Sequence, residues 1–433
     1  MEEEALIYNI KVSSIGPGYV TSPDLIVEPG NMDLAMKLHY LRGVYYFEMQ
    51  AFQGLTTLAI KEPMFMWLNQ HPMSCGRFRR SESGRPYIKC NDCGVRFIEA
   101  NCVHTLDDWL QIIKDGTTLQ HETLLCSNQC IGPELSFSPL IYIQLTKFKC
   151  GGAAVGLSWA HVLGDAFSAA EYMNSLGRVV AGLGPERPIN LGHTPTKPTS
   201  SNGMPGITEE PLSIKRVDPV GDNWVNVTKS KMEAFCCIVN PTQLSHLQTK
   251  LNANGADFAP FEAISAVIWK CIAKIRVQEL EPRVVTICKR SEPNTNYGSN
   301  LRNSQAVSVV KADFPISEAN PSELAALVKN EALDEGRMIE EAMERDHGLA
   351  DFIVYGANLT FVNLEDARFY DFDYRGGKPV SVSYRIDGVG EKGAVLVQTG
   401  GGENGGGRSV TAILPVNEII GFKSELKKEG LMA

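Results

Sequence analysis

Three histidines of the chain are each followed by an aspartate four positions later. They are His104 with Asp108, His161 with Asp165, and His347 with Asp351. A neutral imidazole can take a proton from a hydroxyl or an amine near neutral pH, and a nearby carboxylate can orient the ring. Such a pair is therefore suited to general base catalysis. Because the spacing occurs three times, only the surrounding sequence can select among the pairs.

The elements around His161 distinguish it from the other two histidines. His104 lies at the start of an amphipathic helix, whose first turn favours carboxylates through the helix dipole. His347 ends a charged stretch and is typical of a solvated turn. His161 follows an almost uninterrupted apolar strand over 153–159 and precedes a helix that begins at Ala166. A polar connection at the end of a buried strand is where α/β proteins place their sites.

Two interpretations of His161 remain open at this point. In the first, His161 is a general base, Asp165 fixes the loop and the ring, and Gly164 lets the backbone pass closely. In the second, His161 is a buried histidine with satisfied hydrogen bonds, beside an aspartate that caps the following helix. Composition and spacing do not decide between them.

The cysteines offer a weaker candidate site. Cys90 and Cys93 have the spacing of a zinc ligand pair, and Cys126 with Cys130 is the only second pair nearby. A structural zinc site needs two tight ligand pairs at characteristic spacings, and the second pair here lies in a loop. In a reducing compartment the cysteines are better explained as small buried apolar residues. We therefore predict no metal site.

Size and charge exclude several classes of protein. The chain has 433 residues, and one core stops growing at about 250–300 residues, so two domains are expected. The net charge is −9 and no basic stripe is present, which argues against nucleic-acid binding. The start, MEEEALIYNIKVSS, is not a secretory signal, and no run reaches the ~20 apolar residues of a transmembrane helix. We expect a cytoplasmic protein whose membrane association depends on a partner.

Local patterns divide the chain into two mixed halves. In the first, strands over 141–148 and 153–159 flank a Gly151-Gly152 turn. In the second, we expect a helix over 261–276, strands over 284–290 and 306–314, and one long charged helical stretch over 321–346. A segment rich in Pro, Gly, Ser and Thr lies between the halves. The predicted divisions are an N-terminal domain at 1–185, a crossover at 186–220 and a C-terminal domain at 221–433, with residues near 367–390 packing on the first domain.

Two segments resemble the signatures of the plant BAHD acyltransferase superfamily. LSWAHVLGDAFSAA at 157–170, preceded by TKFKCGG, is similar to its central strand, His-x-x-x-Asp motif and helix. The family's second signature, Asp-Phe-Gly-Trp-Gly before Lys-Pro, corresponds to residues 373–377 before Lys378-Pro379. Here it reads Asp-Tyr-Arg-Gly-Gly. The resemblance covers essentially the whole chain.

The resemblance implies an α/β fold of two similar domains, each a mixed sheet with helices, as in chloramphenicol acetyltransferase. A long crossover joins the domains and a channel runs between them. His161 would deprotonate an acceptor hydroxyl or amine, which attacks the thioester of acyl-CoA. Asp165 would be mainly structural. Acyl-CoA would be a donor or ligand and not a permanently bound cofactor.

The same resemblance implies roles for residues of the second half. Asp373 would hold the second signature, through an ion pair with Arg290. Coenzyme A would meet the second domain near Lys289, Tyr297 and Ser299.

Two departures from the family pattern point to one of its branches. Ala166 stands where the family has Gly, and the second signature has lost its Trp and gained Arg375. Segments such as 32–47, 89–100 and 355–364 are similar to the Eceriferum and Glossy proteins of cuticular wax synthesis. That branch implies work with the fatty acid elongase at the cytosolic face of the endoplasmic reticulum, and contact with its ketoacyl-CoA synthase.

Three functional hypotheses follow from this resemblance. The first is an accessory protein that changes the chain length reached by the elongase. The second is an acyl-CoA-dependent O- or N-acyltransferase with His161 as base. The third is a binding scaffold with a vestigial site. The first is favoured because the second signature is altered.

Overall fold

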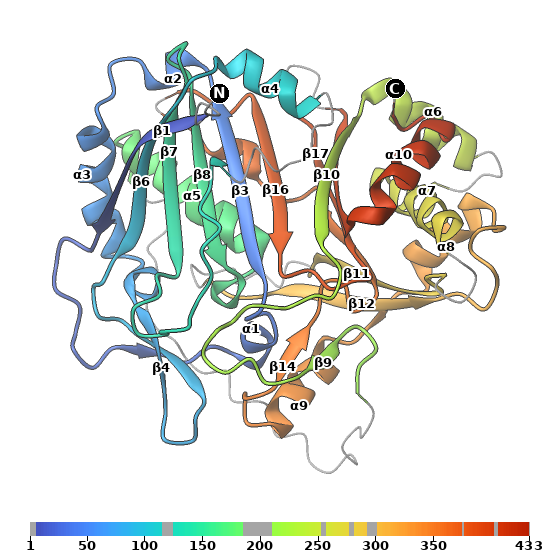
Figure 1. Ribbon diagram of the computed structural model, residues 1–433, viewed down its shortest axis with the longest axis horizontal. Coiled ribbons are helices and arrows are strands. Elements are labelled where there is room, and N and C mark those ends of the chain that lie inside the picture. Colours follow the sequence, from blue (N-terminus) through green and yellow to red (C-terminus); the bar gives the residue numbers. More distant parts are fainter. Residues whose placement is uncertain are drawn as a thin grey trace, which may run out of the picture.

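Two mixed β-sheets, each covered by helices, form the body of the protein (Figure 1). The structure is a computed structural model, and it describes residues 6–114, 124–184, 210–252, 257–276, 281–291, 301–374, 376–401 and 406–432. Most of the expected crossover at 186–220 lies outside these ranges.

The first sheet contains six strands in the described part of the chain. Their order is β1 (Ile7–Ile15), β6 (Val95–Cys102), β7 (Ile141–Lys147), β8 (Ala153–Ala160), β3 (Tyr40–Phe47) and β16 (Ser381–Asp387). Every residue of β3 and β8 is buried. Burial on both faces explains why these central strands are almost continuously apolar. The predicted strand over 153–159 is confirmed.

Helices cover both faces of the first sheet. Helices α3 (Thr57–Leu68) and α5 (Ala166–Val180) pack on each other, and α5 lies behind β8 and β3 in Figure 1. Helix α4 (Leu106–Lys114) places Trp109 in a separate small core cluster that includes Val44 and Tyr46 of β3. Successive side chains of β3 point to opposite faces of the sheet, so this strand contributes residues both to this small cluster and to the main core.

The second sheet contains seven strands among the described residues. Their order is β10 (Met232–Val239), β18 (Arg408–Pro415), β17 (Ala394–Thr399), β15 (Leu359–Leu364), β11 (Val284–Arg290), β12 (Gln305–Lys311) and β13 (Leu333–Asp334). Helix α7 (Pro260–Ile275) lies at the centre of its helical layer. It contacts α6 (Pro241–Leu251), α8 (Pro321–Asn330) and α10 (Val416–Lys428). The helix predicted over 261–276 is confirmed.

Strand β16 joins the first sheet although it comes late in the chain. It pairs antiparallel with β3, from Ser381 opposite Tyr46 to Asp387 opposite Tyr40. Residues 381–387 therefore belong to the sheet built otherwise from residues 7–160. The division of the chain at 185 and 220 stays a prediction.

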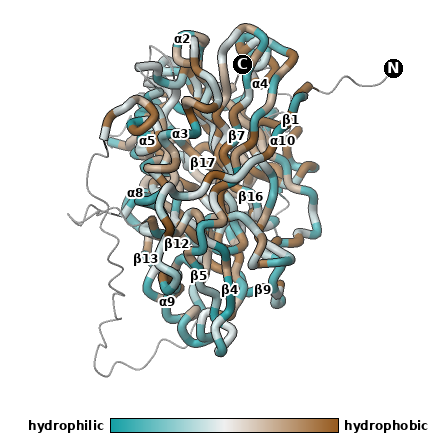
Figure 2. Tube along the Cα trace, turned by 90° about the vertical axis from the view of Figure 1, so that its left-hand side faces the viewer, coloured by the Kyte–Doolittle hydropathy of each residue, from teal (hydrophilic) through white to brown (hydrophobic). Residues whose placement is uncertain are grey.

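Short elements complete the described fold. They are α1 (Asn31–Ala35), α2 (Met49–Phe52), α9 (Gly336–Arg345), the three-stranded sheet β2 (Ile26–Val27), β5 (Pro86–Lys89) and β4 (Arg77–Arg80), and the pair β9 (Lys215–Val217) and β14 (Asp351–Ile353). The 3₁₀ turns are Pro72–Cys75, His161–Leu163 and Phe369–Asp371. Apolar residues gather in the middle of the molecule, and α9, β4 and β9 at one end are mostly hydrophilic (Figure 2).

The single helical stretch predicted over 321–346 is wrong. Helix α8 ends at Asn330, and Leu333 and Asp334 form β13, which pairs with β12. Helix α9 then begins at Gly336. Helical periodicity on both sides cannot reveal this break, because the pairing with β12 is a tertiary contact. The segment 32–47, one of those similar to the Eceriferum and Glossy proteins, contains most of α1 and then β3.

Candidate functional site

His161 lies at the end of β8, in a 3₁₀ turn between the strand and helix α5. Its side chain is completely buried, and its backbone N–H donates to the carbonyl of His39 at 3.1 Å. Gly164 closes the turn at φ 151°. A Cβ there would lie 2.8 Å from Ser168 Cβ and 3.0 Å from Arg302 N. The turn therefore needs glycine for both its conformation and its close packing.

Asp165 is the N-cap of α5, as predicted. Its Oδ1 accepts from the backbone N–H of Ser168 at 2.9 Å. Its Oδ2 accepts from the backbone N–H and the hydroxyl of Ser304 at 2.8 and 3.1 Å. Asp165 is fully buried, and both carboxylate oxygens are engaged by these groups. It ties the start of α5 to the segment that leads into β12 of the second sheet.

The ring of His161 contacts residues of the second half of the chain. Its Nε2 lies 2.9 Å from the hydroxyl of Tyr355, which accepts from Gln305 Nε2 at 2.6 Å. Asn303 Nδ2 donates to the His161 carbonyl at 2.8 Å and to Asp33 Oδ1 at 2.9 Å. His161, at the edge of the first sheet, is therefore held by polar groups that lie beside the second sheet.

A second buried histidine, His39, lies against the same tyrosine. Its Nε2 accepts from the backbone N–H of Val354 at 3.1 Å and of Tyr355 at 3.4 Å. The ring centroids of His39 and Tyr355 are 4.9 Å apart in an edge-on arrangement, and those of His161 and Tyr355 are 5.4 Å apart. His39, His161 and Tyr355 thus form one buried cluster.

Burial keeps this cluster uncharged near neutral pH. Desolvation lowers the pKa of His161 to about 4, although the charge of Asp165 acts in the opposite direction. Desolvation and the nearby His161 lower the pKa of His39 to about 3. Burial raises the pKa of Tyr355 well above its ordinary value. A neutral imidazole can accept a proton, so this electrostatic condition for a general base is met.

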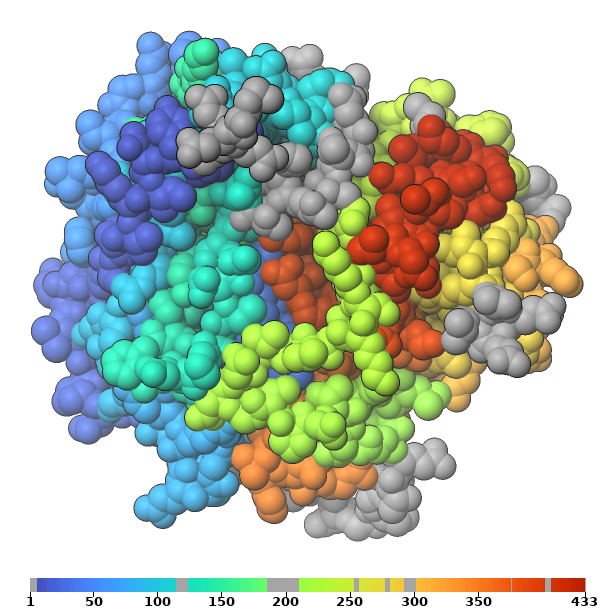
Figure 3. Space-filling view, in the orientation of Figure 1, coloured from blue at the N-terminus to red at the C-terminus, as the bar shows by residue number. Residues whose placement is uncertain are grey.

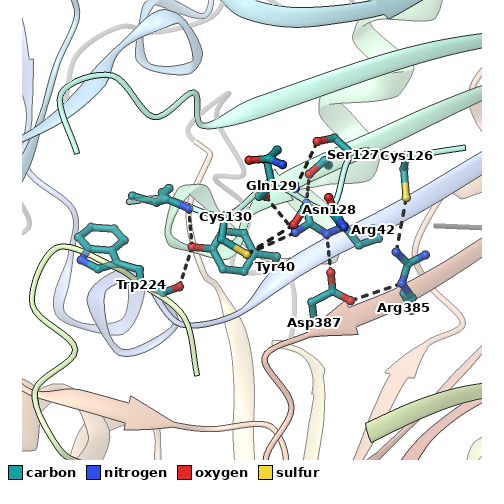
Figure 4. A network of polar contacts seen from close by, with 12 residues as sticks. Tyr40, Arg42, Cys126, Ser127, Asn128, Gln129, Cys130, Trp224, Arg385 and Asp387 are labelled. Atoms are coloured by element: carbon teal, nitrogen blue, oxygen red, sulfur yellow. Dashed lines mark hydrogen bonds and ion pairs between the residues drawn. The ribbon is translucent and has the colours of Figure 1, made fainter. Parts of the chain in front are cut away.

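A network of charged side chains, the ion network, lies where β3, β8 and β16 meet the loop near residue 129 (Figure 4). Arg42 Nε donates to Asp387 at 2.7 Å, Arg42 Nη1 bonds Ser158, and Arg42 Nη2 donates to the carbonyl of Gln129 at 3.0 Å. Arg385 Nε lies 3.4 Å from the other oxygen of Asp387. Arg42 is buried, so its charge needs these partners.

A cavity of about 620 Å³ lies between the edge strands of the two sheets. It is lined by residues of the 226–234 segment, by 385–389 and by Ile413. Figure 3 shows the orange residues of β16 recessed between the blue-green first sheet and the yellow-green strand β10. The ion network therefore borders this cavity through Arg385 and Asp387. His161 is not part of its lining.

The remaining predicted site residues make other contacts or lie outside the described residues. The guanidinium of Arg290 lies over the ring of Phe167, with its centre 5.5 Å from the centroid, and Nη1 donates to the carbonyl of Asp366 at 3.5 Å. Asp373 accepts from the backbone N–H of Gly376 at 2.6 Å. The ion pair between Arg290 and Asp373 stays a prediction.

The predicted coenzyme A contacts also stay predictions. Lys289, at the end of β11, is exposed. Tyr297 and Ser299 lie outside the described residues.

Sequence reasoning missed the residues that complete the cluster. Tyr355, Gln305, Asn303 and His39 are each far from His161 in the chain. Polar side chains beside apolar strands, such as Gln305 at the start of β12, were the only available signal. Their convergence depends on the packing of the two sheets.

Two features are absent from the described residues. No group of three or more His, Cys, Asp or Glu side chains suited to a metal ion occurs within the described ranges. Likewise, no helix in the described part of the chain is long and apolar enough to cross a membrane.

Comparison with known families identifies the class of protein. The family model described as "Transferase family" matches residues 30–429. The chain belongs to this family, the transferases of the BAHD type. It is 42% identical to Protein ECERIFERUM 26 of Arabidopsis thaliana over 99% of this chain and 97% of that protein. It is 36% identical to Protein ECERIFERUM 2 of the same plant, over 98% and 99%. The predicted family membership is confirmed.

Solved structures confirm the fold. Vinorine synthase superposes with a TM-score of 0.75 at 17% identity, covering 98% of each chain. TRI101 of F. sporotrichioides, solved with coenzyme A and T-2, superposes with a TM-score of 0.70 at 15% identity, covering 93% of this chain and 97% of that one. At these identities the likeness concerns the fold alone. The fold class predicted from the sequence is confirmed.

Proposed function

We propose that this protein acts in very-long-chain fatty acid elongation for cuticular wax. It would change the chain-length range of the elongase condensing enzyme, a ketoacyl-CoA synthase, at the cytosolic face of the endoplasmic reticulum. The observation that carries this proposal is the similarity to the ECERIFERUM proteins, at 36–42% identity over nearly the whole chain. By contrast, the Hydroxycinnamoyltransferase of Narcissus pseudonarcissus is 24% identical over 65% of the chain.

The site geometry supports a role other than ordinary acyl transfer. The transferase fold is complete, yet the base nitrogen of His161 is bonded to a buried tyrosine. The second family signature has lost its Trp and gained Arg375. Acyl-CoA is proposed as a ligand because the TRI101 relatives in fold are solved with coenzyme A. A site that binds acyl-CoA without transfer at His161 would fit the proposed accessory role.

An acyl-CoA-dependent acyltransferase is the alternative function. His161 and Asp165 are both retained, and the pKa of His161 is lowered to about 4 by burial, so the ring is neutral at physiological pH. A general base must be neutral to accept the proton of an acceptor hydroxyl.

Co-expression with a wax-type condensing enzyme, in a host that lacks the longest acyl chains, tests the proposal. Acyl chains would be profiled with the condensing enzyme alone and together with wild-type protein, His161→Ala or His246→Ala. His246 is an exposed histidine and serves as the matched control. The expected result is longer chains in all three co-expressions and none with the condensing enzyme alone.

The other outcomes of this experiment discriminate between the functions. If a folded His161→Ala protein loses the effect and His246→Ala keeps it, the chemistry of His161 is in use and the acyltransferase is favoured. If wild-type protein leaves the chain lengths unchanged, the accessory function is refuted for that condensing enzyme.

A further inference from the structure

We propose that Tyr355 is an internal cap on His161, and that its hydroxyl occupies the place where an acceptor hydroxyl would have to bind. A general base must lie about 2.6–3.2 Å from the atom whose proton it removes. The Tyr355 oxygen lies 2.9 Å from His161 Nε2, within this range. The inference concerns the transfer reaction and does not depend on the proposed role in elongation.

The direction of the hydrogen bonds supports the cap. Gln305 Nε2 can only donate, so the Tyr355 oxygen accepts that bond at 2.6 Å. The single phenol proton is then available for His161 Nε2. Burial raises the pKa of Tyr355 well above its ordinary value, so the phenol keeps this proton. In the tautomer with its proton on Nδ1, the lone pair of Nε2 accepts this phenol proton; in the other tautomer, Nε2 donates to the Tyr355 oxygen. In both cases Nε2 is engaged by Tyr355 in the folded protein.

The other ring nitrogen of His161, Nδ1, does not replace Nε2 as the general base. A neutral imidazole that accepts at Nε2 carries its proton on Nδ1. On the backbone side of the ring, Asn303 bonds both the His161 carbonyl and Asp33. Nδ1 itself has no hydrogen-bond partner among the described residues, but it is buried, so an acceptor could reach it only if the packing around the ring changed.

Tyr355 is held firmly in this position. It is 1% exposed, its ring lies edge-on to His39 at 4.9 Å, and its carbonyl accepts from Gly390 N at 2.9 Å. Gly356, the next residue, has φ 84°, and a Cβ there would lie 2.4 Å from the Gly390 oxygen. This tight packing fixes the backbone that carries the phenol, and an acceptor would have to displace a packed side chain.

Removing the phenol should expose the base to water. In Tyr355→Ala, a water molecule at Nε2 would attack the thioester carbonyl of an acyl-CoA while His161 takes its proton. The C–S bond then breaks, and the departing thiolate takes the proton from the imidazolium. The products are a free fatty acid and coenzyme A with a free thiol, so atoms and charge balance.

The first test measures the chemical accessibility of His161. Diethyl pyrocarbonate is applied to wild type, Tyr355→Ala and Tyr172→Ala, and each modified histidine is located by peptide mass spectrometry. Tyr172 is also 1% exposed and packs against a different histidine, His71, so it is the matched control. We expect at least a tenfold faster modification of His161 in Tyr355→Ala only. His71 should stay protected in Tyr355→Ala, which reports an intact fold.

The second test measures coenzyme A release from palmitoyl-CoA with water as the acceptor. General base catalysis typically contributes 10²–10⁴-fold, so we expect Tyr355→Ala to release coenzyme A at least tenfold faster than wild type. Tyr355→Ala/His161→Ala should return to the wild-type rate. If release in Tyr355→Ala does not depend on His161, or if His161 stays protected in the folded variant, the cap is refuted.

If Tyr355→Ala does not fold, a more conservative variant tests whether the Tyr355 hydroxyl is bonded to His161 Nε2. Tyr355→Phe removes only the hydroxyl, and ¹⁵N spectra of labelled histidine would follow Nε2 of His161. The expected result is a shift of this resonance towards its value without a hydrogen bond, while His246 is unchanged. An unchanged His161 resonance would overturn the proposal. None of these measurements uses the elongase, so failure of the cap and failure of the proposed function are distinguishable.

Discussion

Replacing Asp165 by alanine tests whether this aspartate is a structural link between the two sheets. Its Oδ1 caps helix α5 through Ser168 N, and its Oδ2 accepts from the backbone and hydroxyl of Ser304. The variant leaves the helix uncapped and leaves two donors of Ser304 without their acceptor. Both effects act on the folded state, so the free energy of unfolding should fall.

The expected loss follows from these contacts. An N-cap replaced by alanine costs about 1 kcal/mol. Each donor of Ser304 that loses its acceptor in a partly buried place costs about 1 kcal/mol or more. The sum is about 3 kcal/mol. Asp165→Asn keeps one oxygen acceptor and should lose less than Asp165→Ala.

Equilibrium unfolding in urea, followed by circular dichroism, measures this loss. Asp108→Ala is the matched control, because His104 and Asp108 have the same spacing and Asp108 caps its turn through Thr105 in an exposed place. It should destabilise the protein much less. If Asp165→Ala and Asp108→Ala lower the stability equally, the assignment of Asp165 as a buried link is wrong.

Three further predictions concern buried groups. Burial lowers the pKa of His71 to about 3, so the unfolded chain binds more protons between pH ~6.5 and ~3. Stability should therefore fall as the pH falls through this window, and His71→Phe should reduce the slope by up to about 1.4 kcal/mol per pH unit in urea titrations. Gly164→Ala should lower the free energy of unfolding by more than about 1 kcal/mol, because the new Cβ has no room. Gly184→Ala should be neutral, because a Cβ there meets nothing within 4 Å. Equal unfolding midpoints for the two variants would contradict this prediction. Arg42→Met should lower the free energy of unfolding by about 1–3 kcal/mol, because Asp387 loses one partner but is one third exposed and keeps Arg385. Adding Asp387→Asn should recover part of the loss, a coupling that a double-mutant cycle measures.

Local sequence patterns predicted much of the fold because they report burial of single elements. The apolar run at 153–159 is β8, buried on both faces, and the amphipathic pattern at 261–276 is α7. The same patterns failed at 321–346, where Leu333 and Asp334 leave the helix to pair with β12. A distant strand decides that break, and helical periodicity contains no information about it.

The sequence predicted only part of the candidate site. His161 and Asp165 could be selected because a strand end, a turn and a helix start occur in one short segment. The cap of α5 by Asp165 was predictable for the same local reason. The contact with Ser304 was not, since it joins residues 139 positions apart.

The sequence by itself determined the family, the strand–turn–helix unit around His161 and the residue types available for chemistry. These depend on short-range order and on motifs that are contiguous in the chain. Only the tertiary structure decided what His161 can do. Tyr355 is 194 positions away, yet the packing of the two sheets brings its hydroxyl to 2.9 Å from Nε2 in a place without solvent. The protonation state and the free lone pair of a buried imidazole depend on such neighbours, and no local pattern specifies them.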